Sequence, residues 1–372
     1  MNFDLSEDEA MLKALGERVV QDRYCGDMRR AYLDQPCGFS PENWALLGEL
    51  GLIAALGSRA SDEAAFGPDA IVTLFEAFGR GLVVEPLIEN VLLAARLFDT
   101  VAGQELSAEW RDALLAGSKR IALAHAEPRS RPGRLWLETR AEAVDGGMRV
   151  TGTKNCVPAG AGVDGFIVTA RAAGTAGSTE GVALLFIAAE TSGLTPTPWR
   201  MADGSAALRL DLDGAFVPQS CVLSGGITEI EQAQTMANLA RGAEALGIME
   251  RLFADTLDYL RTREQFGTKI GSFQAIQHRM AAQYAVLEQT RGLLNLAVVS
   301  YGSRDFARNV AGLRAFMGAA SINLGHEMIQ FHGGMGVTDE LAIGHGHKRL
   351  LVLSRWPDDQ GSALDKFAGI AA

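Results

Sequence analysis

The spacing of hydrophobic residues changes twice along the chain, and the first part has the period of helices. Residues 6–9 read S-E-D-E, a capping box in which Ser6 caps a helix and Glu9 reaches back to it. Leucine or valine then follows at helical spacing, at positions 12, 15 and 19. Ser40 and Pro41 form a second helix start, because proline loses no hydrogen bond in a first turn. We predict an N-terminal helical domain over residues 1–118.

The middle part of the chain, residues 119–225, has a period of two. Leucines at 208, 210 and 212 alternate with charged residues, a pattern that buries one face of a strand and leaves the other in water. Other short runs of strand-forming residues lie at 149–151, 166–170 and 182–187, and glycine-rich turns separate them. This spacing predicts a β domain built as a sandwich or barrel.

Residues 226–372 return to the helical period. A second capping box, T-E-I-E, stands at residues 228–231, and leucine or phenylalanine recurs every seven residues at 239, 246, 253 and 260. We predict a long helix from Thr228 and two more over residues 272–300 and 304–330, packed as a bundle. The predicted fold class is therefore α+β, with three domains.

The composition excludes several classes of function. The chain has 372 residues, with 34 lysines and arginines against 45 aspartates and glutamates, a net charge of −11. Such a chain lacks the positive charge that a general nucleic-acid binder needs. No apolar run reaches the length of a membrane span, and the N-terminus is acidic where a signal peptide is basic. Cys25, Cys37, Cys156 and Cys221 form no C-x-x-C pair, which is typical of a reducing compartment. We expect a cytoplasmic protein without a membrane partner.

Two patterns that could hold a nucleotide or a metal have simpler interpretations. Residues 160–165 spell G-x-G-x-x-G, but a strand rather than a helix follows, so we interpret them as a turn between strands. Four of the six histidines, His326, His332, His345 and His347, lie near the C-terminus. No cysteine or carboxylate cluster accompanies them at ligand spacing, so we interpret H-G-H at 345–347 as a polar loop and predict no metal site.

Two segments of the C-terminal part favour an anionic cofactor. Residues 261–270, R-T-R-E-Q-F-G-T-K-I, offer guanidinium groups, and residues 330–336, Q-F-H-G-G-M-G, offer a glycine-rich turn. An arginine fork suits a pyrophosphate, and glycines let backbone N–H groups approach a phosphate. Either segment alone could be a helix C-cap followed by a turn. Their occurrence in one bundle favours a cofactor.

At these segments the chain resembles the acyl-CoA dehydrogenase family. The family motif R-x-x-F-G stands at residues 263–267, F-Q-x-x-Q at 273–277 and Q-x-x-G-G-x-G at 330–336. The resemblance covers the whole chain, since the family has a helical domain, a middle β-barrel and a C-terminal four-helix bundle. It implies FAD as cofactor, an acyl-CoA substrate and electron-transfer flavoprotein as acceptor. It also implies that one group of residues contacts a flavin held between two subunits: Arg263, Gln265, Phe266, Gln274, Gln277, Gln330, Phe331, Gly333 and Gly334.

The resemblance fails at the catalytic base. The family's reaction needs a carboxylate that takes the α-proton of the thioester while the β-hydrogen leaves as hydride to the flavin. Family members carry this glutamate early in the first long helix or in a Y-E-G-T loop near the C-terminus. Here those places hold Ala237, followed by Asn238, and R-W-P-D-D-Q at residues 355–360. Asp358 and Asp359 are the carboxylates left as candidates, each one methylene shorter than glutamate.

The middle domain departs from the family as well. The motif T-E-P-x-A-G-S-D, which cups the flavin, reads A-E-P-R-S-R-P-G at residues 126–133, and G-T-K-x-W-I-T reads G-T-K-N-C-V-P at 152–158. Cys156 and Pro158 thus replace the ring and the hydroxyl expected beside the flavin, and the proline also removes a backbone donor. The middle-domain motifs that would hold this chain's own flavin are altered, whereas the C-terminal motifs that would reach a neighbour's flavin are intact.

This asymmetry resembles the small (β) subunit of heteromeric bacterial acyl-CoA dehydrogenases, in which a larger α subunit of an α2β2 tetramer supplies the base. Such pairs act on steroid side chains or on pimeloyl-CoA, and residues 1–6, 336–340 and 347–350 look most like the pimeloyl type. Two alternatives stay open. One is a self-sufficient homotetramer that uses Asp358 or Asp359 as base, and the other is a structural partner that has lost flavin contact.

Overall fold

The structure is a computed structural model that describes residues 6–24, 28–58, 62, 65–131 and 135–369. Its contacts divide the chain into two compact units. The helical unit comprises Met1–Gly26, Pro68–Val83 and Asn238–Ala372, and the sheet unit comprises Asp27–Gly67 and Val84–Ala237. The units group two N-terminal stretches with the C-terminal helices, so the three-domain division at residues 118 and 225 stays a prediction. Residues 1–5, Cys25, Pro132 and Gly133, used in the sequence arguments, lie outside the described residues.

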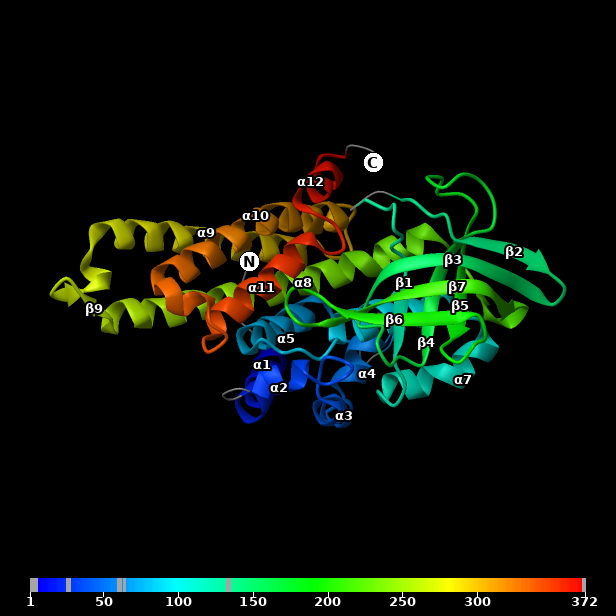
Figure 1. Ribbon diagram of the computed structural model, residues 1–372, viewed down its shortest axis with the longest axis horizontal. Helices are drawn as coiled ribbons and strands as arrows, with labels where there is room; N and C mark the ends of the chain where they lie inside the picture. The colour runs from blue at the N-terminus through cyan, green and yellow to red at the C-terminus, as the bar shows by residue number, and fades with distance from the viewer. Residues whose placement is uncertain (1–5, 25–27, 59–61, 63–64, 132–134, 370–372) are drawn as a thin grey trace. The chain divides into compact units, whose positions relative to one another are not determined.

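The helical unit consists mainly of long helices (Figure 1). They are α1 (Glu7–Arg23), α5 (Pro68–Gly81), most of α8 (Ile227–Thr262), α9 (Gln274–Val299), α10 (Phe306–His332), α11 (Ala342–Arg355) and α12 (Gln360–Ala368). The predicted helices over 272–300 and 304–330 are confirmed as α9 and α10. A Cβ added at Gly79 of α5 would lie 2.2 Å from the backbone oxygen of Glu244 in α8, and one at Gly247 would lie 2.2 Å from that of Glu76. These two glycines therefore permit the close packing that joins α5 to the bundle.

The helix starts test the predicted caps one by one. The capping box at residues 6–9 is confirmed, because Ser6 Oγ accepts from the Glu9 N–H at 3.3 Å and the Ser6 N–H donates to Glu9 Oε2 at 2.7 Å. Ser40 caps α3 (Pro41–Glu49) as predicted. The predicted box at Thr228 is wrong, since α8 begins at Ile227 and it is Glu229 that accepts a backbone N–H, that of Gly226, at 2.6 Å.

The sheet unit is built on one eight-stranded sheet in the order β6-β7-β3-β2-β4-β5-β8, with β1 paired in parallel to β4. The strands are β1 (Ile121–Ala124), β2 (Arg140–Val144), β3 (Gly147–Pro158), β4 (Gly165–Arg171), β5 (Val182–Ala188), β6 (Leu194–Arg200), β7 (Ala206–Pro218) and β8 (Val222–Leu223). The leucines at 208, 210 and 212 are buried in β7, which confirms the predicted strand. Residues 159–164 connect β3 to β4, so the G-x-G-x-x-G stretch is the predicted turn.

Short helices complete the sheet unit. They are α2 (Met28–Leu33), α3, α4 (Leu52–Gly57), the π-helix η1 (Leu87–Ala95), α6 (Arg96–Val101), α7 (Gln104–Leu115) and the 3-10 turn η2 (Gln219–Cys221). Their mainly aliphatic core includes three aromatic rings, with the ring of Phe186 in β5 lying 5.3 Å from that of Phe98 and 4.6 Å from that of Trp110. Among the described residues, no helix is both long and apolar enough to cross a membrane.

Candidate functional site

The first of the two predicted cofactor segments forms a hairpin beyond α8. Strands β9 (Glu264–Gln265) and β10 (Thr268–Lys269) pair, and the Ile270 N–H donates to the Arg263 carbonyl at 2.9 Å. The two tip residues, Phe266 and Gly267, have φ values of 55° and 78°, as a type I′ turn requires. Phe266 is 92% exposed, and its ring meets that of Phe273 edge-on at 6.3 Å. The hairpin thus carries a solvent-exposed aromatic ring at its tip.

The second segment forms a tight turn beyond α10. Helix α10 ends at His332, and the 3-10 turn η4 (Gly333–Val337) follows. Gly333 has φ 59° and ψ −138°, a conformation that is open essentially to glycine alone. A Cβ added at Gly333 or Gly334 would meet no atom within 4 Å. Gly333 is therefore needed for the backbone path, and its N–H donates to the Gln330 carbonyl, while the side of each glycine where a Cβ would stand is open.

A stacked ring pair brings the two segments together. The ring of Tyr259 in α8 lies 4.4 Å from that of His332 in α10, with an angle of 21° between the planes. The Arg263 N–H donates to the Tyr259 carbonyl at 2.8 Å, and Gly333 follows His332 directly. Figure 1 shows the hairpin, labelled β9, at the far end of the helical unit. The structure therefore places the two segments at one end of the bundle, which we call the bundle end (residues 259–277 and 330–337).

The predicted cofactor contacts at the bundle end divide into two groups. Eight of the nine are exposed to solvent, and six of these eight have no side-chain hydrogen bond among the described residues: Arg263, Phe266, Gln274, Gln330, Gly333 and Gly334. Within the described part of the chain, no hydrogen bond or ion pair engages the Arg263 guanidinium. The other three are used within the chain. Gln265 Nε2 donates to the Glu264 carbonyl at 2.8 Å, Gln277 Nε2 to the Gly271 carbonyl at 3.0 Å, and Phe331 is buried beneath Arg279, whose guanidinium lies 4.7 Å from the ring.

In the sheet unit, the two segments that depart from the family lie side by side. Ala126 and Cys156 form a β-bridge, and the Asn155 N–H donates to the Ala126 carbonyl at 3.0 Å. Burial, together with the charge of Glu89, raises the pKa of the Cys156 thiol to about 12. Cys156 is therefore a neutral thiol near pH 7 and a poor nucleophile. The segments converge as the resemblance implies, but without the ring and hydroxyl of the family motif.

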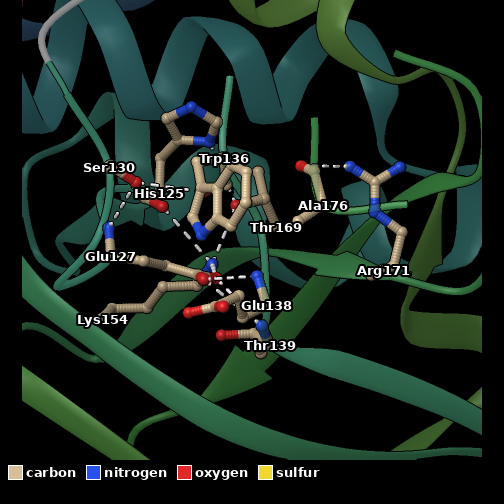
Figure 2. A network of polar contacts seen from close by, with 10 residues as sticks. All are labelled: His125, Glu127, Ser130, Trp136, Glu138, Thr139, Lys154, Thr169, Arg171 and Ala176. Atoms are coloured by element: carbon tan, nitrogen blue, oxygen red, sulfur yellow. Dashed lines mark hydrogen bonds and ion pairs between the residues drawn. The ribbon is translucent and has the colours of Figure 1, made fainter. Parts of the chain in front are cut away.

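A buried polar network, which the sequence analysis did not predict, lies next to the Ala126–Cys156 bridge (Figure 2). Lys154 Nζ lies 2.6 Å from Glu127 Oε1, and the two side chains are 0% and 2% exposed. Burial lowers the pKa of Lys154 to about 8, although Glu127 acts in the opposite sense. Burial opposes ionisation of Glu127, but Lys154 and the surrounding donors outweigh it and lower the pKa of Glu127. Burial also lowers the pKa of His125 to about 4, so His125 is neutral at pH 7.

The places where a base would stand contain no available carboxylate. Ala237 is buried, and the Oδ1 of Asn238 accepts from Arg241 at 3.0 Å. Asp358 is buried between Arg314, at 3.3 Å, and Lys366, at 3.2 Å. Its burial favours the neutral acid, but the two cations outweigh this and lower its pKa. Asp359 caps α12 by accepting from the Ser362 N–H at 2.9 Å. Both aspartates thus have structural contacts that argue against a role as base.

The histidine cluster differs from its predicted surroundings. His345 and His347 lie in α11 and not in a loop, and the expectation of a polar loop is wrong. The glycine between them fits the helix because a Cβ at Gly346 would lie 2.7 Å from Leu252 of α8. Among the described residues, no group of three histidine, cysteine or carboxylate side chains could hold a metal ion.

Comparison with known proteins shows which family the chain resembles. Residues 224–356 match the family model described as "Acyl-CoA dehydrogenase, C-terminal domain". Acyl-CoA dehydrogenase FadE27 of Mycobacterium tuberculosis is 28% identical over 348 residues, which cover 91% of this chain and 90% of that protein. One chain of the crystal structure of the ChsE4-ChsE5 complex from M. tuberculosis superposes with a TM-score of 0.85 at 26% identity, covering 100% of this chain and 98% of that one. The C-terminal part of the chain thus matches the acyl-CoA dehydrogenase family, and the whole chain is similar to members of that family.

The likeness to solved acyl-CoA dehydrogenase structures confirms the predicted α+β fold. The acyl-CoA dehydrogenase of Geobacillus kaustophilus shares that fold with a TM-score of 0.89 at 18% identity, covering 99% of each chain. The matched family model and the similar relatives support an oxidoreductase that acts on acyl-CoA thioesters with FAD. The matched residues 224–356 include the whole bundle end.

Proposed function

We propose that this chain is a flavin-sharing subunit of a heteromeric acyl-CoA dehydrogenase and has no catalytic base of its own. The observation that carries the proposal is a contrast between two sets of residues. The family's flavin motifs are intact and solvent-exposed at the bundle end, whereas Asp358 and Asp359 are held by structural contacts and Ala237 replaces a base. A chain that both bound flavin and removed the α-proton itself would need a carboxylate near the reacting α-carbon.

The bundle end fits the diphosphate part of a flavin. Arg263 supplies an exposed guanidinium, and the backbone at Gly333 and Gly334 is open to close approach. Phe266 offers an exposed ring at the hairpin tip. When bound, FAD accepts the hydride that leaves the β-carbon of the acyl-CoA. The role of these residues is to hold and orient the cofactor from the side opposite the subunit that supplies most of its site.

The sheet unit fits a flavin less well. Cys156 offers a neutral thiol and Pro158 no hydroxyl and no N–H, where the family motif has a ring and a hydroxyl. We infer that a larger homologous α subunit supplies the base and most of the flavin site, in an α2β2 assembly. The ChsE4-ChsE5 structure supports this inference, because its name describes a complex of two proteins. We also propose electron-transfer flavoprotein as the electron acceptor and a cytoplasmic location. The substrate would be a CoA thioester with a steroid side-chain or dicarboxylic acyl group.

The proposal is tested by counting flavin. The chain is purified alone and together with the larger homologue that the proposal requires, and FAD per chain is measured by absorbance. We expect little FAD on the single chain, and about half a flavin per chain with turnover in the complex. Arg263→Ala should lower the flavin content of the complex several-fold. Arg261→Ala is the matched control, because Arg261 is also exposed but already pairs with Asp258 at 3.5 Å.

Two results would contradict the proposal. A full complement of flavin and turnover by the pure single chain would favour the self-sufficient homotetramer. An unchanged flavin content in the Arg263→Ala complex would favour a structural partner without flavin contact.

A further inference from the structure

Arg279 of α9 contacts the last two turns of α10. Its Nε donates to Glu327 Oε2 at 2.6 Å, and its guanidinium carbon lies 4.7 Å from the centre of the Phe331 ring. Residues 327 and 331 are four positions apart and so lie on one face of the helix. Phe331 is buried, whereas Arg279 is 45% exposed and covers the ring from outside. A single side chain thus joins α9 to the end of α10, just before the glycine turn.

The contacts of the Arg279 guanidinium are those of a structural link and not those of an anion site. Glu327 accepts its hydrogen bond and balances its charge. The guanidinium also lies over an aromatic ring, a position that arginine favours. Arg263 differs, because in the described part of the chain no carboxylate pairs with it. We call the Arg279 side chain, with its contacts to Glu327 and Phe331, the strut.

A second contact holds the next residue of α10. The ring of His332 stacks on that of Tyr259 in α8 at 4.4 Å, and His332 Nδ1 lies 2.9 Å from the Met328 carbonyl. Phe331 and His332 are therefore held from two neighbouring helices, α9 and α8. Gly333 comes next, and it has no side chain that could anchor the turn itself. The path of the turn therefore depends on the two rings that precede it.

We propose that Arg279 is a positioning residue for the flavin site, acting through Phe331 on the turn at Gly333. Gln274, a predicted flavin contact, lies on α9 as Arg279 does, whereas the turn follows α10. The strut holds these two helices at one spacing, so that less order has to be gained when the cofactor binds. The inference rests on the proposed function, because it takes the bundle end as a flavin site. Arg279 itself lies outside the three family motifs.

Flavin affinity and amide exchange together test the strut. The apo complex of the chain with the larger homologue is titrated with FAD. Arg279→Met should weaken binding about fivefold, the scale of one exposed cation–π contact and one surface ion pair together. On the chain alone, exchange of the Gly333 amide, which donates to the Gln330 carbonyl, should become several-fold faster. The thermal midpoint should stay within a few degrees of that of the wild type, because the substituted side chain lies at the surface.

Arg251→Met is the matched control. Arg251 also donates to a carboxylate at 2.6 Å, that of Asp255, and is 43% exposed, but it lies about two turns of α8 before the bundle end. This variant should leave both the FAD affinity and the exchange of the Gly333 amide unchanged. In a Phe331→Leu background, Arg279→Met should weaken FAD binding by less than about twofold more, because the ring through which it acts is gone.

Three results would overturn the proposal. Wild-type FAD affinity in Arg279→Met, together with a loss in Arg263→Ala, would leave the proposed function standing and remove the role of Arg279. The full effect of Arg279→Met in the Phe331→Leu background would mean that the arginine does not act through the ring. If Phe331→Leu does not fold, unchanged exchange of the Gly333 amide in Arg279→Met takes the place of that result. Unchanged FAD affinity in both arginine variants would refute the proposed function, and this inference with it.

Discussion

The substitution Asp358→Asn separates the two roles that the late loop could have. Asp358 is 3% exposed, and its carboxylate lies 3.3 Å from Arg314 and 3.2 Å from Lys366. Arg314 in turn donates to the carbonyls of Leu353 at 2.5 Å and Trp356 at 2.9 Å. The aspartate therefore neutralises the arginine that holds the loop after α11 in place. We expect Asn at this position to destabilise the protein without changing the chemistry of the folded complex.

The magnitude follows from what the substitution leaves behind. Removing one partner of a buried ion pair costs about 3–5 kcal/mol, because the other charge stays buried and uncompensated. Arg314 keeps its carbonyl acceptors, and Lys366 is 45% exposed and remains hydrated, so both limit the loss. We therefore expect a decrease of about 3 kcal/mol in the free energy of unfolding. Because the pKa of Asp358 is lowered, its stabilisation is present at neutral pH and is lost as acid protonates the folded state.

Urea unfolding of the variant measures this decrease, and turnover of the assembled complex is measured in parallel. The matched control is Asp365→Asn, an exposed carboxylate on the same helix α12, which should change stability by less than about 0.5 kcal/mol. Turnover per folded complex should equal that of the wild type. Unchanged stability together with a loss of turnover by orders of magnitude would refute the structural role and make Asp358 the base.

Three further predictions concern the packing, the buried histidine and the glycine turn. Gly79→Ala places a methyl group 2.2 Å from the Glu244 oxygen and should destabilise by about 1–3 kcal/mol in thermal unfolding, whereas Gly292→Ala, open on α9, should stabilise by about 0.5–1 kcal/mol. The pKa of His125 is about 4 in the folded state, so the unfolded state binds one more proton than the folded state between pH 6.5 and 4. The free energy of unfolding of the wild type should therefore fall by about 3 kcal/mol as the pH is lowered over that range. His125→Asn, which keeps an acceptor, should show a shallower acid profile in urea titrations. Gly333→Ala strains the turn at φ 59° and should lower the flavin content of the complex while leaving its thermal midpoint within a few degrees.

The elements with a strong local pattern could be predicted from the sequence. The leucines of β7 alternate with charges, which predicted its buried face, and α9 and α10 begin and end within two residues of the predicted ranges. Histidine and glycine at positions 345–347 suggested a loop because glycine disfavours helices in isolation. The structure gives the opposite result, since the lack of a side chain at Gly346 lets α11 pack against Leu252. Packing between helices decides such positions, and one sequence does not contain that information locally.

The buried network shows a second limit. Lys154 and Glu127 are 27 positions apart, Lys154 in β3 and Glu127 in the connection after β1, and in either place a charged residue suggests an exposed position. One signal was available, because Lys154 follows Val150 at an even spacing and so lies on the buried face of β3. A lysine in that position requires a buried acid nearby. Its partner, however, is fixed by the pairing of Ala126 with Cys156, a contact between distant segments.

The hairpin at the bundle end supports the proposed partner through its backbone conformation and its exposure. Phe266 has a positive φ of 55°, a backbone conformation that costs a non-glycine residue about 1–2 kcal/mol. Its side chain is also 92% exposed, so the fold does not recover that cost by burying the ring. Burial of a phenylalanine against another surface contributes about 1.5–3 kcal/mol, which is enough to offset the strain. A hairpin with this tip is therefore unfavourable on an isolated chain and favourable when a second subunit, or the flavin that it holds, covers the ring.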